Sequence, residues 1–481
     1  MAETSARSPH YAPDRRTALV LTGSGVDGAY HAGAVRALTE AGVRIDVVAG
    51  RGVGAVGALF AAIDGASRLW EPTGLWRRRA VRRLYPWRKA LRRVVAGLAV
   101  AAAVLVVPPL VLALGATVYQ VAVLLDVVRS GTGARLAQQW EMVRLVAFAP
   151  DGLPTRVPQA VAAVLAVVVL AIVVGALRAR ASAPARRDLL GGVWWTVLGA
   201  PLAAAPTIDY FITGLWDLLR GGARVSQPTR EDLSRRYAEL LGDNLGQPGF
   251  RELLIVAHDL DARQDLVFAL LGRDWRRPFF LRRQTTGLDR RSAEAVDLAG
   301  AARDHVLDAV AAALTLPVAT DAQLIGFAPE SYWRGETHRL TDRPAALVRV
   351  LEEVAIAGAR QVIVVTAAEE LGGPHELSRR RNAPRARLSE FLASAEAAAV
   401  RDAINVAAPW FDALFVVRPS HNPVTPLDTA GAFDERSDRV QVVGELVDRG
   451  YEDAYRQFID PVVGASGEQM AASADAVRSA E

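Results

Sequence analysis

The chain has 481 residues, of which 51% are hydrophobic and 22% are charged, and it contains no cysteine. This composition excludes an intrinsically disordered chain, a disulfide framework, a thiolate metal site and a cysteine nucleophile. The net charge of +4 conceals a strongly basic stretch between residues 77 and 93, which contains no acidic residue.

Two strand–turn–helix units open the chain after a polar N-terminal tail, residues 1–16, in which we find no signal peptide. The predicted strands cover residues 16–22 and 43–49, their glycine turns cover 23–28 and 50–54, and the helices that follow end at Glu40 and Ile63. Strand, glycine turn and helix in this repeated order are typical of a parallel α/β sheet.

The basic stretch forms a collar in front of a long apolar insert. Its positive residues are Arg77, Arg78, Arg79, Arg82, Arg83, Arg88, Lys89, Arg92 and Arg93. Trp76, Tyr85 and Trp87 are interleaved with them, and residues 94–128 then contain one charged residue, Asp126, before Arg129. Such a segment is typical of the cytoplasmic flank of a transmembrane helix, and we expect it to bind anionic headgroups rather than nucleic acid.

Three apolar segments make up the insert. Residues 157–177 carry no charge and reach about 32 Å as a helix, which is enough to span a bilayer. Residues 94–128, interrupted by Pro108 and Pro109, predict either one kinked helix or a broken, partly re-entrant one. Residues 189–219 predict an interfacial or re-entrant segment. The arginines flank the first two segments on one side, which predicts an in–out–in path with the α/β domain in the cytoplasm.

The strands resume after the insert. Further predicted strands cover residues 253–258, 265–270, 361–366 and 413–417, and a helix is predicted at 350–358. If residues 17–67 and 250–417 build one sheet, the insert must cross the membrane an even number of times. The predicted division of the chain is a tail at 1–16, α/β segments at 17–67 and 228–417, the insert at 68–227, a helical extension at 418–463 and a loose tail at 464–481.

The first glycine turn matches the dinucleotide-binding pattern through Gly23, Gly25 and Gly28. That pattern also needs an acid at the carboxyl end of the second strand, whereas Asp46 lies at its start and Arg51 follows its end. A dinucleotide-dependent oxidoreductase is therefore an alternative supported by the glycines alone.

Residues 19–38, together with residues 46–55, resemble the start of a patatin-like phospholipase domain. The resemblance covers roughly residues 17–67 and 228–417, and residues 418–461 are similar to the C-terminal extension of some bacterial members. It implies an α/β lipid acyl hydrolase fold, here a parallel-sheet domain interrupted by a transmembrane helical insert. The oxyanion-type loop then comprises Gly23, Ser24, Gly25, Asp27 and Gly28, and the nucleophile elbow comprises Gly50, Arg51, Gly52, Val53 and Gly54.

The chain departs from the family pattern at each catalytic position. Gly52 stands at the place of the nucleophilic serine, and Asp27 stands where the family has arginine or lysine. The alignment puts Arg334 at the position of the dyad aspartate. Substitutes for the missing groups are Ser24 as nucleophile and Glu336 or Asp342 as base. A carboxylate in the oxyanion loop opposes the stabilisation of a developing negative charge.

These observations predict a membrane-anchored, catalytically dead homologue of a lipid acyl hydrolase that binds lipid or a partner protein. The alternative from the enzyme class is an active lipid acyl hydrolase that uses non-standard residues. We expect no metal and no cofactor, because the seven histidines form no ligand motif. His31 and His258 are expected to be structural.

Overall fold

A computed structural model describes residues 11–125, 131–182, 199–281, 290–370 and 382–464. The chain divides into two compact units, an α/β unit of residues 1–86 and 202–481 and a helical unit of residues 87–201. Of the predicted termini, residues 1–10 and 465–481 lie outside the described residues. The sequence predicted an insert at residues 68–227, which is wider than the helical unit. Residues 68–86 and 202–227 group with the α/β unit instead.

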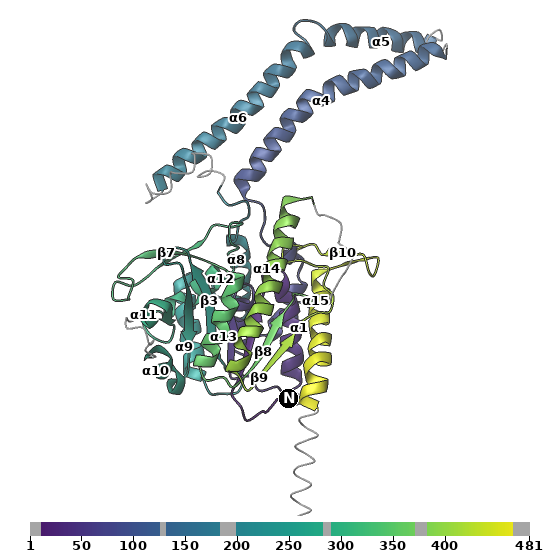
Figure 1. Ribbon diagram of the computed structural model, residues 1–481. Coiled ribbons are helices and arrows are strands. Elements are labelled where there is room, and N and C mark those ends of the chain that lie inside the picture. Colours follow the sequence, from purple (N-terminus) through teal and green to yellow (C-terminus); the bar gives the residue numbers. More distant parts are fainter. Residues whose placement is uncertain (1–10, 126–130, 183–198, 282–289, 371–381, 465–481) are drawn as a thin grey trace, which may run out of the picture. The chain divides into compact units, whose positions relative to one another are not determined.

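The α/β unit is built on a nine-stranded sheet with the main order β5-β4-β3-β2-β1-β8-β9, in which β7 pairs with β3 and β6 pairs with β7 (Figure 1). The strands are β1 (Thr17–Thr22), β2 (Val47–Gly50), β3 (Glu252–Asp259), β4 (Gln264–Leu270), β5 (Ala295–Asp297), β6 (Gln323–Gly326), β7 (Thr337–Thr341), β8 (Gln361–Thr366) and β9 (Ala413–Val417). A separate hairpin comprises β10 (Ala432–Asp434) and β11 (Arg439–Gln441).

The pairing crosses the insert and confirms that the two halves of the chain share one sheet. β2 lies parallel to β3, with Val47 opposite Glu252 and Gly50 opposite Ile255. β1 also pairs in parallel with β2 and β8. The sheet is mixed rather than wholly parallel, because β3 is antiparallel to both β4 and β7.

Helices cover both faces of the sheet. Those of the α/β unit are α1 (Asp27–Glu40), α2 (Gly54–Ala61), α3 (Ser67–Trp70), α8 (Ala205–Leu219), α9 (Arg230–Asn244), α10 (Arg273–Leu281), α11 (Arg290–Glu294), α12 (Val306–Ala313), α13 (Leu347–Ile356), α14 (Pro384–Ala407) and α15 (Val443–Ala454). Short 3-10 segments are η1 (Leu75–Arg77), η2 (Arg79–Arg83), η5 (Arg303–His305), η6 (Pro344–Ala346) and η7 (Ala408–Trp410), and a π-helical segment is η8 (Tyr455–Gly464).

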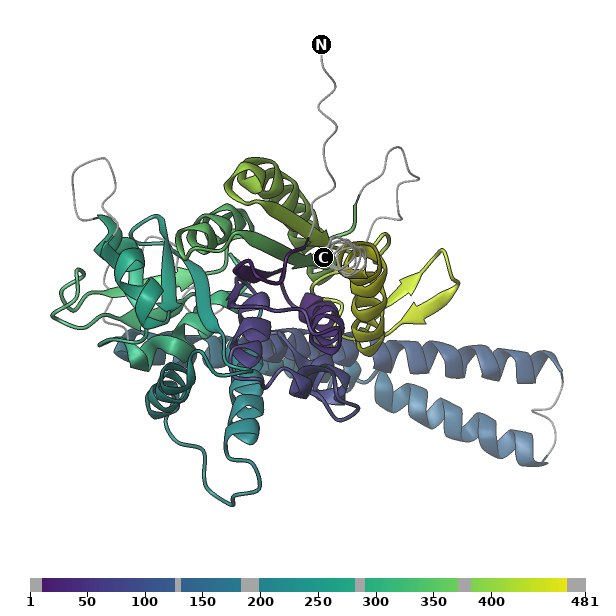
Figure 2. The same cartoon turned by 90° about the horizontal axis from the view of Figure 1, so that it is seen from below.

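The two faces of the sheet bury different side chains because successive residues of a strand point in opposite directions. Val20 and Val364 belong to the core that α13 and α14 cover, together with Val350 and Ala403 of those helices. On the opposite face, Leu21 contacts α2 so closely that Gly57 leaves no space for a side chain. α15 lies alongside α1 (Figure 2), so the C-terminal extension is part of the α/β unit.

The helical unit contains α4 (Lys89–Leu124), α5 (Gly131–Ala147) and α6 (Leu153–Ser182). α4 is one continuous helix with Pro108 and Pro109 inside it, so the broken alternative for this segment is wrong. Gly97 of α4 lies against Val168 of α6, where a Cβ would meet a valine methyl at 2.3 Å. α4 and α6 are the two helices among the described residues that are long and apolar enough to cross a membrane.

The third apolar segment, residues 189–219, packs against protein in the helix that the structure describes. Residues 189–198 lie outside the described residues, and residues 205–219 form α8, which belongs to the α/β unit. Phe211 of α8 contacts the Trp76 ring at 5.3 Å, and Leu215 is fully buried. The prediction of an interfacial or re-entrant segment is therefore wrong for α8, because its apolar face meets protein rather than lipid.

Candidate functional site

The elbow between β2 and α2 adopts a turn that leaves no room for a side chain at its centre. Gly52 has a φ of +55°, a backbone conformation that glycine adopts without strain. A Cβ at Gly52 would lie 2.1 Å from the carbonyl oxygen of Gly23 and 3.1 Å from Oδ2 of Asp342. The loop after β1 therefore closes directly onto the position at which a nucleophile would stand.

The backbone N–H groups around this elbow already have acceptors within the protein. Val53 N–H, the group after the nucleophile position, donates to the Gly23 carbonyl at 2.9 Å. In the oxyanion-type loop, Ser24 N–H donates to Oδ2 of Asp27 at 2.9 Å, and Val26 N–H donates to the carbonyl of Pro426 at 2.9 Å. In hydrolases with such an elbow, N–H groups at these places stabilise the oxyanion of the reaction.

Arg51 is completely buried at the centre of a charged network. Its Nε and Nη2 donate to both carboxylate oxygens of Asp342, at 3.1 and 2.7 Å. Its Nη1 donates to Glu396 at 2.5 Å and to the Thr22 hydroxyl at 2.8 Å. Burial opposes the charged form, but the two carboxylates outweigh it and raise the pKa of Arg51, so the guanidinium stays charged.

The network joins four parts of the fold at the carboxyl edge of the sheet. Thr22 ends β1, Arg51 follows β2, Asp342 follows β7 and Glu396 lies on α14. Ser24 adds a hydroxyl that donates to Oδ2 of Asp342 at 3.3 Å. Arg51, Asp342 and Glu396 are all buried, and each finds its hydrogen-bond partners within the network.

Asp27 is a second buried carboxyl beside this network. Burial raises its pKa to about 8, with the nearby Glu396 carboxylate contributing in the same direction. Asp27 is therefore neutral at pH 7. His31, one turn further along α1, places Nε2 3.0 Å from the carbonyl of Thr22, and burial lowers its pKa to about 4. This histidine is neutral and connects α1 to the end of β1.

The structure brings some of the predicted site residues together and separates others. Asp342 and Ser24, named above as substitutes, lie beside Gly52. Arg334 is exposed in the turn between β6 and β7, where its N–H donates to the carbonyl of Ser331. Glu336 is also exposed, and its carboxylate contacts Nε2 of His338 at 3.2 Å. The acid that lies beside the elbow is therefore Asp342, eight residues after Arg334, the residue that the alignment puts at this position.

Sequence reasoning missed Glu396 and Thr22 entirely. Glu396 lies in an alanine-rich helix among other charged residues, so no pattern distinguishes it as buried. Asp342 carried a detectable signal, since it stands just before the segment that forms α13, as an acid in a strand-to-helix connection.

A cleft of about 520 Å³ opens at this edge of the sheet, lined by Asp27, Glu369, Glu396, Arg418 and Thr425 among others. Ligands of open α/β sheets bind outside the carboxyl ends of the strands. The cleft thus borders Asp27 and Glu396 on the side of α14.

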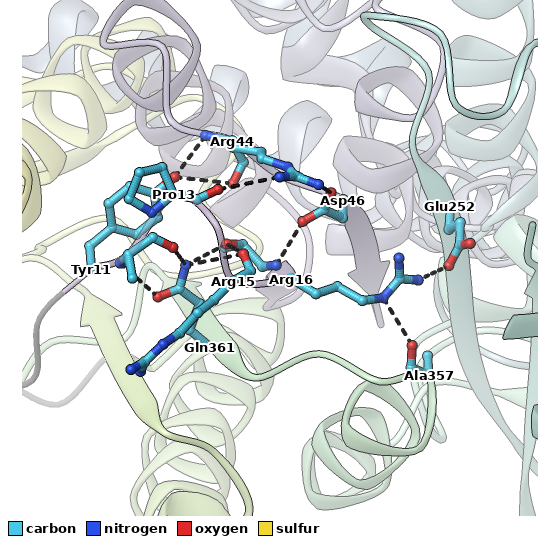
Figure 3. A network of polar contacts seen from close by, with 11 residues as sticks. Tyr11, Pro13, Arg15, Arg16, Arg44, Asp46, Glu252, Ala357 and Gln361 are labelled. Atoms are coloured by element: carbon cyan, nitrogen blue, oxygen red, sulfur yellow. Dashed lines mark hydrogen bonds and ion pairs between the residues drawn. The ribbon is translucent and has the colours of Figure 1, made fainter. Parts of the chain in front are cut away.

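Asp46, the acid considered for a dinucleotide site, lies at the opposite, amino edge of the sheet. Figure 3 shows it among the first residues of the chain, where its Oδ2 accepts from the N–H of Thr17 at 2.8 Å. Its Oδ1 accepts from Nε of Arg44 at 3.0 Å. Asp46 therefore joins β1 to β2 and is remote from the glycine loop, so the acid that a dinucleotide site needs is absent from the described end of β2.

Known proteins similar to this chain were found in one family model and among solved structures. The family model described as Patatin-like phospholipase matches residues 19–137. No curated protein matches the chain. Among solved structures, the chain is similar to VipD from Legionella pneumophila, with a TM-score of 0.29 and 14% identity, covering 93% of this chain and 66% of that one.

Proposed function

We propose that this chain is a non-hydrolytic member of the patatin-like family that α4 and α6 anchor in a membrane and that acts by binding lipid or a partner protein. The observation that carries the proposal is the closure of the elbow. Gly23 occupies the space above Gly52 and accepts the Val53 N–H, so both the nucleophile and an oxyanion donor are lost together. Loss of an activated serine alone costs about 10⁶-fold in turnover.

In this proposal Asp342, not Arg334, occupies the position of the dyad acid. Its carboxylate lies within 3.1 Å of the place of a Cβ on Gly52. Both of its oxygens accept from Arg51, so this carboxylate is paired with a buried guanidinium as well as with the Ser24 hydroxyl. Binding rather than catalysis then uses the 520 Å³ cleft and the membrane surface, where the basic collar, residues 77–93, meets anionic headgroups.

One observation favours the enzyme alternative, namely the hydrogen bond from Ser24 to Asp342 at 3.3 Å. A serine hydroxyl next to a carboxylate is the arrangement of a nucleophile and its base. Ser24 is nevertheless only 3% exposed, and it lies in the loop whose N–H groups would have to bind the oxyanion.

Hydrolysis assays on the full chain in detergent test the two readings. We expect no turnover of phospholipid or p-nitrophenyl esters and no labelling by a fluorophosphonate probe. Ester turnover that is lost in Ser24→Ala and Asp342→Asn but retained in Ser331→Ala, a change at the β6–β7 turn, would establish the enzyme alternative.

Restoration of the missing serine tests the closed elbow directly. We expect Gly52→Ser to remain unlabelled by the fluorophosphonate, because its Cβ collides with a backbone carbonyl. We also expect Gly52→Ser to melt at a lower temperature than the wild type. Labelling of a well-folded Gly52→Ser protein would contradict the proposal that the loop has closed the site.

A further inference from the structure

The α/β unit has a single place at which the chain leaves for the helical unit and returns from it. Pro86 and Leu202 are the two residues of the α/β unit that border the helical unit in sequence. The N–H of Ala203 donates to the carbonyl of Pro86 at 2.9 Å, and the N–H of Leu202 donates to the carbonyl of Ala319 at 2.9 Å. The loop that contains Ala319 therefore lies directly beside this exit point.

That loop presents an exposed valine in a strained conformation. Val318 is 93% exposed and has a φ of +65°, which a β-branched residue rarely adopts. Thr320 closes the loop through two hydrogen bonds to Leu316, from its N–H to the carbonyl at 3.1 Å and from the Leu316 N–H to its hydroxyl at 2.8 Å. An apolar side chain held at such a tip is more favourable in a bilayer interface than in water.

Basic side chains lie close in sequence to the exit point at Pro86, which is next to the tip through the hydrogen bonds of Ala203 and Leu202. Arg79, Arg82 and Arg83 of η2 are exposed, and the helix ends three residues before Pro86. No acidic residue occurs between residues 77 and 86. An apolar tip near exposed arginines complements the surface of a bilayer that contains anionic lipid.

We propose that the loop Leu316–Thr320 inserts Val318 into the headgroup region of an anionic bilayer, with the arginines of η2 bound to lipid phosphates. The proposal rests on the membrane anchor of the proposed function, since α4 begins three residues after Pro86.

Single-cysteine fluorescence on the full chain tests the contact, because the natural chain has no cysteine. Val318→Cys carries an NBD label, and the protein is reconstituted in vesicles of phosphatidylcholine and phosphatidylglycerol. Val406→Cys is the control, since Val406 is 51% exposed and lies near the far end of α14, about 32 Å along its axis from Arg385. Arg385 binds the carbonyl of Tyr85, next to the exit point, at 2.8 Å.

Doxyl-labelled lipid is expected to quench the label at 318 about threefold more strongly than the label at 406, and aqueous iodide is expected to do the reverse. Arg82→Ala with Arg83→Ala, or vesicles of phosphatidylcholine alone, should lower the lipid quenching at 318 by about half. Equal iodide quenching at 318 and 406 would overturn the proposal.

A third label separates this proposal from the anchor on which it rests. Val167 of α6 is 66% exposed, so a label on Val167→Cys reports insertion of the helical unit. Lipid quenching at 167 without quenching at 318 rejects the loop contact and keeps the anchor. Quenching at 318 without quenching at 167 supports the loop contact and rejects the anchor, and quenching at neither position rejects both.

Discussion

At the scale of single residues, Arg51 supplies the positive charge that the two buried carboxyl groups beside the elbow need. It is fully buried and pairs with two carboxylates that are themselves buried, Asp342 and Glu396. We expect Arg51→Met to lower the free energy of unfolding by about 3–5 kcal/mol, because it leaves two buried carboxylates without their counter-charge. Arg68→Ala is the matched control, since Arg68 and Glu71 form an exposed pair at 3.7 Å, and its cost should stay below about 1 kcal/mol.

Urea unfolding of the purified protein, followed by tryptophan fluorescence, measures both variants. The double variant Arg51→Met with Asp342→Asn should recover part of the loss, because only Glu396 then remains unpaired. Equal stabilities of Arg51→Met and Arg68→Ala would mean that the buried network contributes no more than a surface pair.

Asp27 should make the protein less stable as the pH rises through neutrality. Burial raises its pKa from 3.8 to about 8 in the folded state. Between these values the folded protein binds a proton that the unfolded chain has released, so stability falls with increasing pH up to about 8. His31 has the opposite sign, because its folded pKa is about 4 and the unfolded chain binds the additional proton between that value and 6.5.

A comparison with Asp27→Asn separates the two effects, because His31 contributes equally to both proteins. We expect the melting temperature of the wild type to fall, relative to that of Asp27→Asn, between pH 6.5 and pH 8.5. The asparagine retains an oxygen that accepts the Ser24 N–H, so the comparison changes the titration and keeps the hydrogen bond. Parallel pH curves for the two proteins would show that Asp27 is already ionised at neutral pH.

At the scale of elements, α1 and α15 approach at the level of their backbones. A Cβ at Gly33 of α1 would lie 1.8 Å from the carbonyl oxygen of Val447 in α15. We expect Gly33→Ala to lower the free energy of unfolding by about 2–3 kcal/mol, because α15 would have to move away from α1, against which it packs. The same denaturation measurement checks it.

Gly242 provides a control in another helix, at which the change from glycine to alanine should alter the stability in the opposite direction. It also lies in a helix, α9, but nothing stands within 4 Å of its missing side chain. Gly242→Ala should raise the stability by about 0.5 kcal/mol, because alanine favours the helical conformation over glycine. If both variants shifted the stability in the same direction, the close approach of α1 and α15 would not limit the fold.

The sequence predicts some elements to the residue and misses others for physical reasons. The runs at 361–366 and 413–417 match β8 and β9. β8 lies between β1 and β9 and is buried throughout, because a strand inside a parallel sheet is apolar on both faces. β6, with the sequence Gln-Leu-Ile-Gly, is short and half exposed, so no periodic signal marks it.

The site shows the same division between local and tertiary information. Its two turns follow from local glycine patterns, and Gly23, Gly25 and Gly52 indeed have positive φ angles. The partners of Arg51 do not follow, because Asp342 and Glu396 come from segments 291 and 345 residues away in the chain. Pairing over such distances depends on the fold as a whole, so no motif with a fixed residue spacing predicts it from the sequence.

At the scale of the whole molecule, the sheet constrains the path of the chain through a membrane. β2 precedes the helical unit and β3 follows it, yet the two strands are hydrogen-bonded neighbours. Both ends of the helical unit must therefore lie on one side of any bilayer. The two candidate spans, α4 and α6, satisfy this requirement with one crossing each.

Cysteine accessibility measures this path, and three exposed positions suit it. Thr73 precedes α4, Ser226 follows α8, and Asp151 lies between α5 and α6. We expect a membrane-impermeant maleimide to label Thr73→Cys and Ser226→Cys from the cytoplasmic face and Asp151→Cys from the opposite face, because the arginines that flank both spans remain inside. Labelling of Thr73→Cys and Ser226→Cys from opposite faces is incompatible with the pairing of β2 and β3. Labelling of all three from one face would show that α4 and α6 do not cross the membrane, and the proposed anchor would be wrong.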